Sequence, residues 1–172
     1  VAVADDNAAG LAAALKTTGA KRAYADYREM LDKEKPDIVS ISQRWIDKHH
    51  EMIIAAAEHG CHVYMEKPFV RTLVEADDVV RECEMRHLKL AIAHGNRFTP
   101  QLAIAKKLIA GGEIGDVLEL RVRGKEDSRR GGGEDLWVLG THMLDLMRAL
   151  VGDVADCFAT ATVKGRPVRK AD

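Results

Sequence analysis

The chain has 172 residues, of which 47% are hydrophobic and 31% charged, and its formal net charge is −1. This length suits one domain or parts of two, and this apolar content supports a packed core rather than a disordered segment. The balanced charge argues against a nucleic-acid-binding surface, and no apolar run approaches the roughly 20 residues that a membrane helix needs.

The first half of the chain alternates short apolar strands with helices. Strands are expected at residues 1–4, 22–24, 37–42, 61–65 and 90–93. Asn7 and Asp47 are expected to cap two of the intervening helices, Gly60 to end one, and Thr72 and Glu75 to form a capping box. Short connections between alternating elements predict an α/β fold with a parallel, doubly wound sheet that is covered on both faces.

The pattern changes near residue 95. The elements expected from there are a helix begun by Thr99 and Pro100, an antiparallel strand at 118–122, a glycine-rich loop at 131–133, a helix at 140–150 and a strand at 158–163. We therefore expect an incomplete Rossmann-type dinucleotide-binding domain at 1–96. The start of an α+β domain with a mostly antiparallel sheet is expected at 97–172.

The first strand ends in Asp5 and Asp6, as the second strand of a dinucleotide-binding fold does, and no G-x-G-x-x-G turn precedes it. The chain is therefore expected to be a fragment cut at both ends, without the first strand and the glycine-rich turn, or the product of an aberrant gene model. An acid at this position accepts hydrogen bonds from ribose hydroxyls and repels a 2′-phosphate, which favours NAD over NADP. The alternative is a solvated turn or helix cap.

Glu66-Lys67-Pro68 directly follows the buried strand at 61–65. Ligands of open α/β sheets bind outside the carboxyl ends of the strands, so a lysine here can donate to a substrate oxygen or pass a proton. Glu66 would neutralise part of that charge or hold a ribose. The alternative is a surface ion pair at a strand end, where Pro68 simply terminates the strand.

His142 and Asp145 are three residues apart on the expected helix at 140–150, so they lie on nearly the same face. Histidine is the natural proton carrier near neutral pH, although a lone helical histidine is more often structural. Trp137 could stack on a sugar or pack in a core or interface. The three cysteines lack metal-ligand spacing, which favours a reducing, cytoplasmic compartment and no metal site.

These motifs together resemble one family, in its order and over essentially the whole chain. They are Asp5, Glu66-Lys67-Pro68, Asn96-Arg97-Phe98, Gly112-Glu113-Ile114-Gly115 and Gly140-x-His142-x-x-Asp145. The pattern is similar to that of the glucose–fructose oxidoreductase/inositol dehydrogenase/rhizopine-catabolism (Gfo/Idh/MocA) family. The resemblance implies an NAD- or NADP-dependent oxidoreductase acting on a sugar, polyol or related compound. It also implies a C-terminal sheet that mediates homo-oligomers.

The resemblance also implies roles for single residues. Lys67 and His142 would face the substrate, with His142 as the general acid/base. The expected cofactor contacts are Asp5, Glu66, Pro68 and Arg97, and the expected substrate contacts are Asp145 and Trp137. The chain alone is expected to be inactive, because the phosphate-binding turn is missing.

Two positions depart from the family pattern. Many members carry an aspartate four residues before the histidine, where this chain has Val138, and residues 42–45 replace a common Thr-Pro. A helical path would place Asp135 two turns from His142, too far to replace that aspartate directly, whereas a loop would allow the replacement. Two alternatives therefore stay open: an NAD-dependent glycosidase of the same family, and a dinucleotide-binding sensor without turnover.

Overall fold

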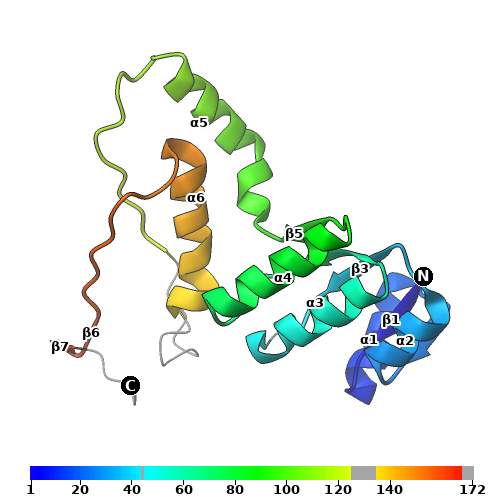
Figure 1. Cartoon of the computed structure of the whole chain (residues 1–172). Helices are drawn as coiled ribbons and strands as arrows, with labels where there is room; N and C mark the ends of the chain where they lie inside the picture. The colour runs from blue at the N-terminus through cyan, green and yellow to red at the C-terminus, as the bar shows by residue number, and fades with distance from the viewer. Residues whose placement is uncertain (44, 125–134, 168–172) are drawn as a thin grey trace. The chain divides into compact units, whose positions relative to one another are not determined.

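The computed structural model describes residues 1–43, 45–124 and 135–167, and the chain divides into two compact units, Val1–Ala93 and His94–Asp172 (Figure 1). The structure therefore divides the chain at Ala93, whereas the expected boundary was at residue 96. The roles assigned to the two domains remain predictions.

The first unit contains all five strands expected there. Its elements are β1 (Ala2–Ala4), α1 (Ala8–Thr18), β2 (Arg22–Tyr24), α2 (Tyr27–Glu34), β3 (Ile38–Ile41), the 3-10 turn η1 (Ile46–Lys48), α3 (His49–Glu58), β4 (His62–Met65), α4 (Leu73–Met85) and β5 (Leu90–Ile92). The five strands pair only in parallel. The predicted α/β class with parallel strands is confirmed.

The parallel strands form two groups. β1 pairs with β2, and β4 lies between β3 and β5. Ile41 of β3 is opposite Met65 of β4, which in turn is opposite Ile92 of β5, so these three strands end at one edge. Within the described ranges, no ladder joins β1 to β3. The carboxyl edge of β3–β4–β5 is the edge from which Glu66-Lys67-Pro68 extends.

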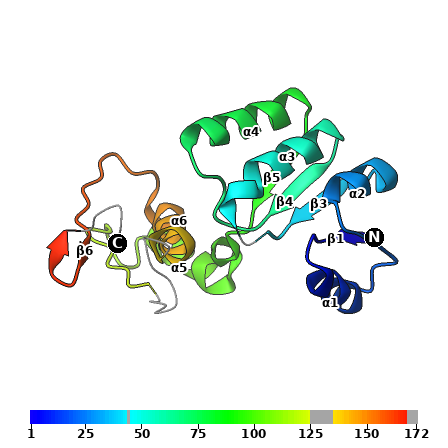
Figure 2. The same cartoon turned by 90° about the horizontal axis from the view of Figure 1, so that it is seen from below.

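The three-stranded sheet is buried on one face, not on both as the sequence predicted. α3 and α4 lie side by side over it (Figure 2). Val63 and Met65 of β4 are buried, and they join Ile53 of α3 and Val79 of α4 in the core. Tyr64 on the opposite face is 50% exposed. Because adjacent strand residues point to opposite faces, β4 alternates in burial instead of being apolar and buried throughout.

Most helix ends follow the expected local chemistry. Asn7 Oδ1 accepts from the Gly10 N–H at 2.9 Å, and Thr72 Oγ1 accepts from the Glu75 N–H at 3.1 Å. The capping box is incomplete, because the Glu75 carboxylate accepts from the Arg71 N–H at 2.9 Å rather than from the Thr72 N–H. These caps occupy amide groups that have no partner inside their own helix.

The prediction that Asp47 caps a helix is wrong. Asp47 lies inside the 3-10 turn η1, which leads directly into α3 at His49. The His49 N–H donates to Ile46 O of that turn. A preceding turn therefore satisfies the start of α3, and no side-chain cap is found at its N-terminal position Lys48.

The second unit contains η2 (Gly95–Phe98), α5 (Pro100–Ala110), the π-helical turn η3 (Asp135–Gly140), α6 (Thr141–Val151), β6 (Thr162–Val163) and β7 (Arg166–Pro167). The helix start at Thr99 and Pro100 is confirmed: Thr99 Oγ1 accepts from the Leu102 N–H at 3.4 Å. η3 runs without interruption into α6, so a helical backbone reaches from Asp135 to His142 and beyond.

Two expected strands of this unit are absent or shortened. Residues 118–122 form no strand, and Leu118 is 94% exposed. Of the strand expected at 158–163, only Thr162 and Val163 pair, with β7. A half-buried strand needs a neighbour and a core beneath it. The described residues of this unit supply only the β6–β7 hairpin, and the glycine-rich loop at 131–133 lies outside them.

Candidate functional site

Asp5 lies just beyond β1, against the first turn of α1. Its Oδ1 accepts from the Asn7 N–H at 2.8 Å, and its own N–H donates to Tyr24 O at 3.1 Å. A Cβ atom added at Gly10 would lie 2.5 Å from Asp5 Oδ2, so a larger residue there would displace this carboxylate. The N-terminal end of a helix carries partial positive charge, which favours an anion at this position.

Glu66, Lys67 and Pro68 leave the carboxyl end of β4 in three different environments. The Glu66 N–H donates to Ile41 O of β3 at 2.8 Å, which fixes the start of the turn. The Lys67 N–H donates to Glu66 Oε2 at 3.3 Å, and the Lys67–Pro68 peptide bond is cis. Glu66 is exposed, Lys67 half-buried and Pro68 buried. The lysine is therefore partly shielded at the sheet edge that the sequence indicated.

The second unit brings together three residues that the sequence singled out. Asp145 follows His142 by three residues on α6, and Arg97 comes from η2. Arg97 Nε donates to Asp145 Oδ1, which forms an ion pair. The Asp145 side chain is only 12% exposed. Arg97 thus neutralises a largely buried carboxylate one helical turn from His142.

His94 completes this group. Its ring lies edge-on to that of His142, with centroids 6.1 Å apart and an interplanar angle of 82°. Its Nδ1 lies 4.0 Å from Asp145 Oδ2. Both atoms are buried without a hydrogen-bond partner among the described residues. A gap of that length is too wide for a direct hydrogen bond, so a third polar atom could satisfy both.

We refer to His94, Arg97, His142 and Asp145 as the second-unit cluster. The sequence interpretation missed His94, although it directly follows an apolar strand, as Glu66 does. Its position at the carboxyl end of a strand was the sequence signal that could have identified it. Arg97 was expected to contact the cofactor, and the structure pairs it with Asp145. Its role in cofactor binding remains a prediction.

Trp137 and Val138 both lie in η3. Trp137 is 51% exposed, and among the described residues no hydrogen bond or ring contact joins it to the second-unit cluster. Its role in substrate binding remains a prediction. Val138 stands four residues before His142, in the turn that continues into α6.

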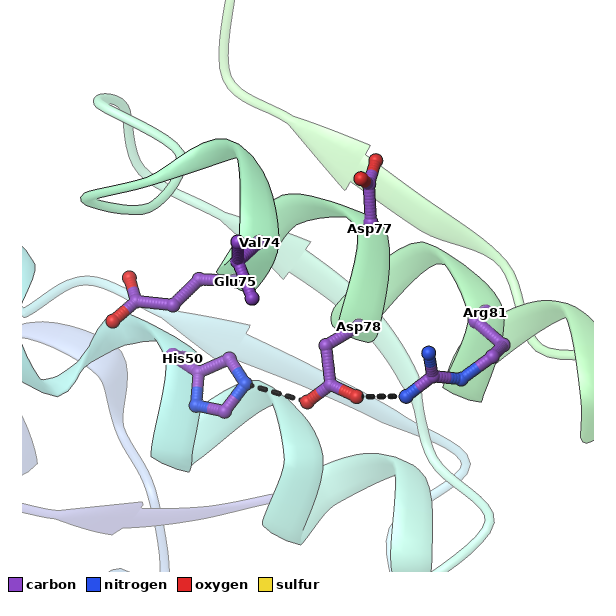
Figure 3. Close-up of a pocket in the computed structure, with 6 residues that line it drawn as sticks. All are labelled: His50, Val74, Glu75, Asp77, Asp78 and Arg81. Carbon is purple, nitrogen blue, oxygen red and sulfur yellow. Dashed lines mark hydrogen bonds and ion pairs between the residues drawn. The ribbon is translucent and has the colours of Figure 1, made fainter.

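A surface depression of about 440 Å³ lies between α3 and α4, away from the residues singled out above (Figure 3). His50 Nε2 lies 2.8 Å from Asp78 Oδ2, and Arg81 pairs with the other oxygen of the same carboxylate. Because His50, Asp78 and Arg81 bind one another, this depression is better explained by helix–helix contacts than by a ligand. The described residues contain no group of three side chains that could hold a metal ion, and no helix long and apolar enough to cross a bilayer.

Comparisons with known proteins give matches along most of the chain. The model of the "Oxidoreductase family, NAD-binding Rossmann fold", GFO_IDH_MocA, matches residues 1–94. Levoglucosan dehydrogenase from Pseudarthrobacter phenanthrenivorans is 32% identical over 169 residues, which cover 88% of this chain and 42% of that protein. The 2,7-anhydro-N-acetylneuraminate hydratase from Mediterraneibacter gnavus is 40% identical over 70 residues, covering 41% of this chain and 19% of that protein.

Solved structures are similar as well. A levoglucosan dehydrogenase in complex with NADH and levoglucosan superposes with a TM-score of 0.76 at 28% identity. The match covers 88% of this chain and 44% of that one. The chain thus spans less than half the length of these relatives.

Proposed function

The chain belongs to the Gfo/Idh/MocA oxidoreductase family, with its NAD-binding Rossmann fold, and from this premise we propose that the protein carrying it is a dinucleotide-dependent dehydrogenase. Its substrate is a sugar, a polyol or a related small molecule. The first unit binds the dinucleotide and the second the substrate. NAD is the preferred cofactor, with NADP as the alternative.

The second-unit cluster is the observation that carries this proposal. His142 lies one turn from a carboxylate that Arg97 already neutralises, beside a second imidazole. Oxidation of an alcohol removes a hydride from carbon and a proton from oxygen, and the nicotinamide, when bound, accepts the hydride. We assign the proton to His142, because an imidazole can accept it near neutral pH.

Lys67 has a complementary role in this proposal. Its ammonium group donates a hydrogen bond to the reacting oxygen and stabilises the negative charge that develops as the proton leaves. Its place at the carboxyl end of a parallel strand supports this role, since ligands of open α/β sheets bind at that edge. Because Lys67 is half-buried, fewer water molecules compete with the substrate oxygen for its ammonium group.

Asp5 supports the choice of NAD. A carboxylate offers about four acceptor sites. The Asn7 N–H occupies one of them, which leaves acceptor capacity for ribose hydroxyls. A 2′-phosphate beside the same carboxylate would be repelled, as like charges are.

Titration calorimetry of the intact protein with NAD and NADP tests the cofactor proposal. Asp5→Ala should weaken NAD binding by about tenfold or more, because hydrogen bonds to a charged acceptor are lost. Asp6→Ala is the matched control, since Asp6 is exposed and its Oδ2 lies 3.4 Å from Lys48 Nζ. That variant should bind NAD almost as the wild type does. Failure of the wild type to bind either dinucleotide would overturn the proposal.

A second candidate is a reaction in which the cofactor is reduced and reoxidised within one turnover. The match to a protein named as a hydratase favours it, because the matched relatives do not all carry dehydrogenase names. The two candidates differ in one observable. A dehydrogenase accumulates NADH with its substrate, whereas transient use converts the substrate with no net NADH.

We also propose that the intact protein is a cytoplasmic homo-oligomer. Leu118 and Phe158 of the second unit are 94% and 95% accessible, and an interface with another copy of the protein would remove such apolar side chains from water. Light scattering of the intact protein measures the assembly, and a monomer at micromolar concentration would contradict it.

A further inference from the structure

His49 is completely buried at the first residue of α3, with 0% of its surface exposed. Its Nδ1 lies 2.8 Å from Pro68 O and 3.0 Å from Phe69 O. Its Nε2 lies 2.8 Å from Gln43 O. The ring therefore contacts three backbone carbonyls, through both of its nitrogens.

These carbonyls belong to two different loops. Gln43 follows β3, whereas Pro68 and Phe69 follow Lys67 after β4. The strands are neighbours, so both loops leave the same edge of the sheet. One buried side chain thus connects the loop after β3 with the loop that begins just after Lys67.

The rest of α3 fixes the ring in this place. Ile53, Ala56 and Ala57 of the helix are fully buried in the core. Because the helix cannot shift without opening that core, the position of the imidazole is set by the packing of α3. The neighbouring His50 points elsewhere, with its Nε2 on Asp78 of α4 (Figure 3).

The chemistry of the contacts limits what the ring can do. Carbonyl oxygens only accept hydrogen bonds, so a nitrogen that binds one must carry a hydrogen. Which of the two nitrogens donates depends on the tautomer. In either tautomer one nitrogen faces a carbonyl of each loop at 2.8 Å, so the ring links the two loops.

We propose that His49 is a positioning residue, whose buried ring holds the turn at Lys67 and Pro68 against the loop after β3. In this way it sets where the Lys67 ammonium stands. The catalytic consequence rests on the proposed function, because it requires Lys67 to act on a substrate. The link between the two loops does not depend on the proposed function.

Three variants separate the hydrogen bonds from the volume of the ring. His49→Phe keeps a buried ring without donors, and His49→Gln keeps an amide that donates. His50→Phe makes the same change one residue later, at a side chain that contacts α4 instead. Amide hydrogen exchange over residues 66–70 should accelerate about tenfold or more in His49→Phe, as expected for lost buried hydrogen bonds.

His49→Gln should restore part of the exchange protection, and His50→Phe should leave exchange over residues 66–70 as in the wild type. Unchanged exchange in His49→Phe would overturn the proposal. If that variant fails to fold, nitrogen NMR of histidine-labelled wild-type protein at neutral pH decides. A ring N–H of His49 that is protected from exchange with solvent supports the bridge, and one that exchanges as fast as in an unfolded chain overturns it.

Kinetics of the intact protein test the link to Lys67. His49→Phe should lower kcat about tenfold or more, since misplaced catalytic groups cost that much, and leave the affinity for dinucleotide within about twofold. In a Lys67→Ala background the same change should have almost no further effect on kcat. Faster exchange with unchanged kcat would overturn the positioning role. If the protein turns over no substrate, the proposed function fails, and exchange and NMR still decide the bridge.

Discussion

Arg97 donates a hydrogen bond from Nε to Oδ1 of Asp145, although 48 residues separate them in the chain. The contact joins η2 to α6 inside the second unit. It also leaves Asp145 Oδ2 facing His94 Nδ1 at 4.0 Å. The pair therefore organises the group in which His142 lies.

Asp145→Asn should destabilise the second unit. The change removes the charge that Arg97 neutralises, and at a carboxylate that is 12% exposed we expect a loss of about 1–3 kcal/mol in the free energy of unfolding. Asp153→Asn is the matched control, because Asp153 pairs with Arg148 while 82% exposed. Such a pair contributes about 0–1 kcal/mol. Equal effects of both changes in urea unfolding would contradict this view of the cluster.

Gly10→Ala should act against the usual trend for helices. Replacing a helical glycine by alanine normally stabilises by about 0.5–1 kcal/mol. Here the added Cβ would lie 2.5 Å from Asp5 Oδ2, so the carboxylate must move and its bond to the Asn7 N–H is disturbed. We expect a net loss of about 1 kcal/mol in thermal or urea unfolding. At Gly95, where nothing lies within 4 Å of an added Cβ, the same change should cause no such loss.

His59 should make the stability of the first unit depend on pH. Its Nε2 lies 2.9 Å from Asp32 Oδ1. This hydrogen bond raises the pKa of His59 above its usual value, and a smaller contribution in the same direction comes from the bond between His59 Nδ1 and Ala55 O. The folded protein then holds the proton more tightly than the unfolded chain. The stabilisation is complete below the unfolded pKa of about 6.5 and is lost as pH rises through the folded pKa.

His59→Gln should accordingly lower the free energy of unfolding most in mild acid, with a difference from wild type that shrinks as pH rises. Urea titrations at a series of pH values measure this. Asp32→Asn removes the charged partner of His59 and should flatten the same dependence. A difference that grows with pH would contradict the assignment.

The parts of the fold that local chemistry determines could be predicted from the sequence. Asn7, Thr72 and Thr99 cap helices as expected, because each side chain reaches an amide only three residues away. The five parallel strands were recognisable as short apolar runs between helices. Lys67 and His142 could be proposed as catalytic residues because each lies in a motif of only a few consecutive residues.

Features that depend on distant partners could not be predicted. Residues 118–122 alternate as a strand does, yet no strand among the described residues pairs with them and they form none. The carbonyls that His49 contacts are up to 20 residues away along the chain, so its neighbourhood gave no hint of them. His94 could be recognised as a member of the second-unit cluster only from its position beside Asp145, which is distant in the sequence.

The central claim is that the intact protein oxidises a small hydroxylated substrate with NAD, using His142 as the base. Initial rates of NADH formation with a set of sugars and polyols test it most directly, with His142→Gln as the variant and His50→Gln as the control. We predict turnover of at least one substrate by the wild type and the control. His142→Gln should lower kcat about 10²- to 10⁴-fold while it still binds NAD. A His142→Gln variant that retains the wild-type kcat would contradict the account.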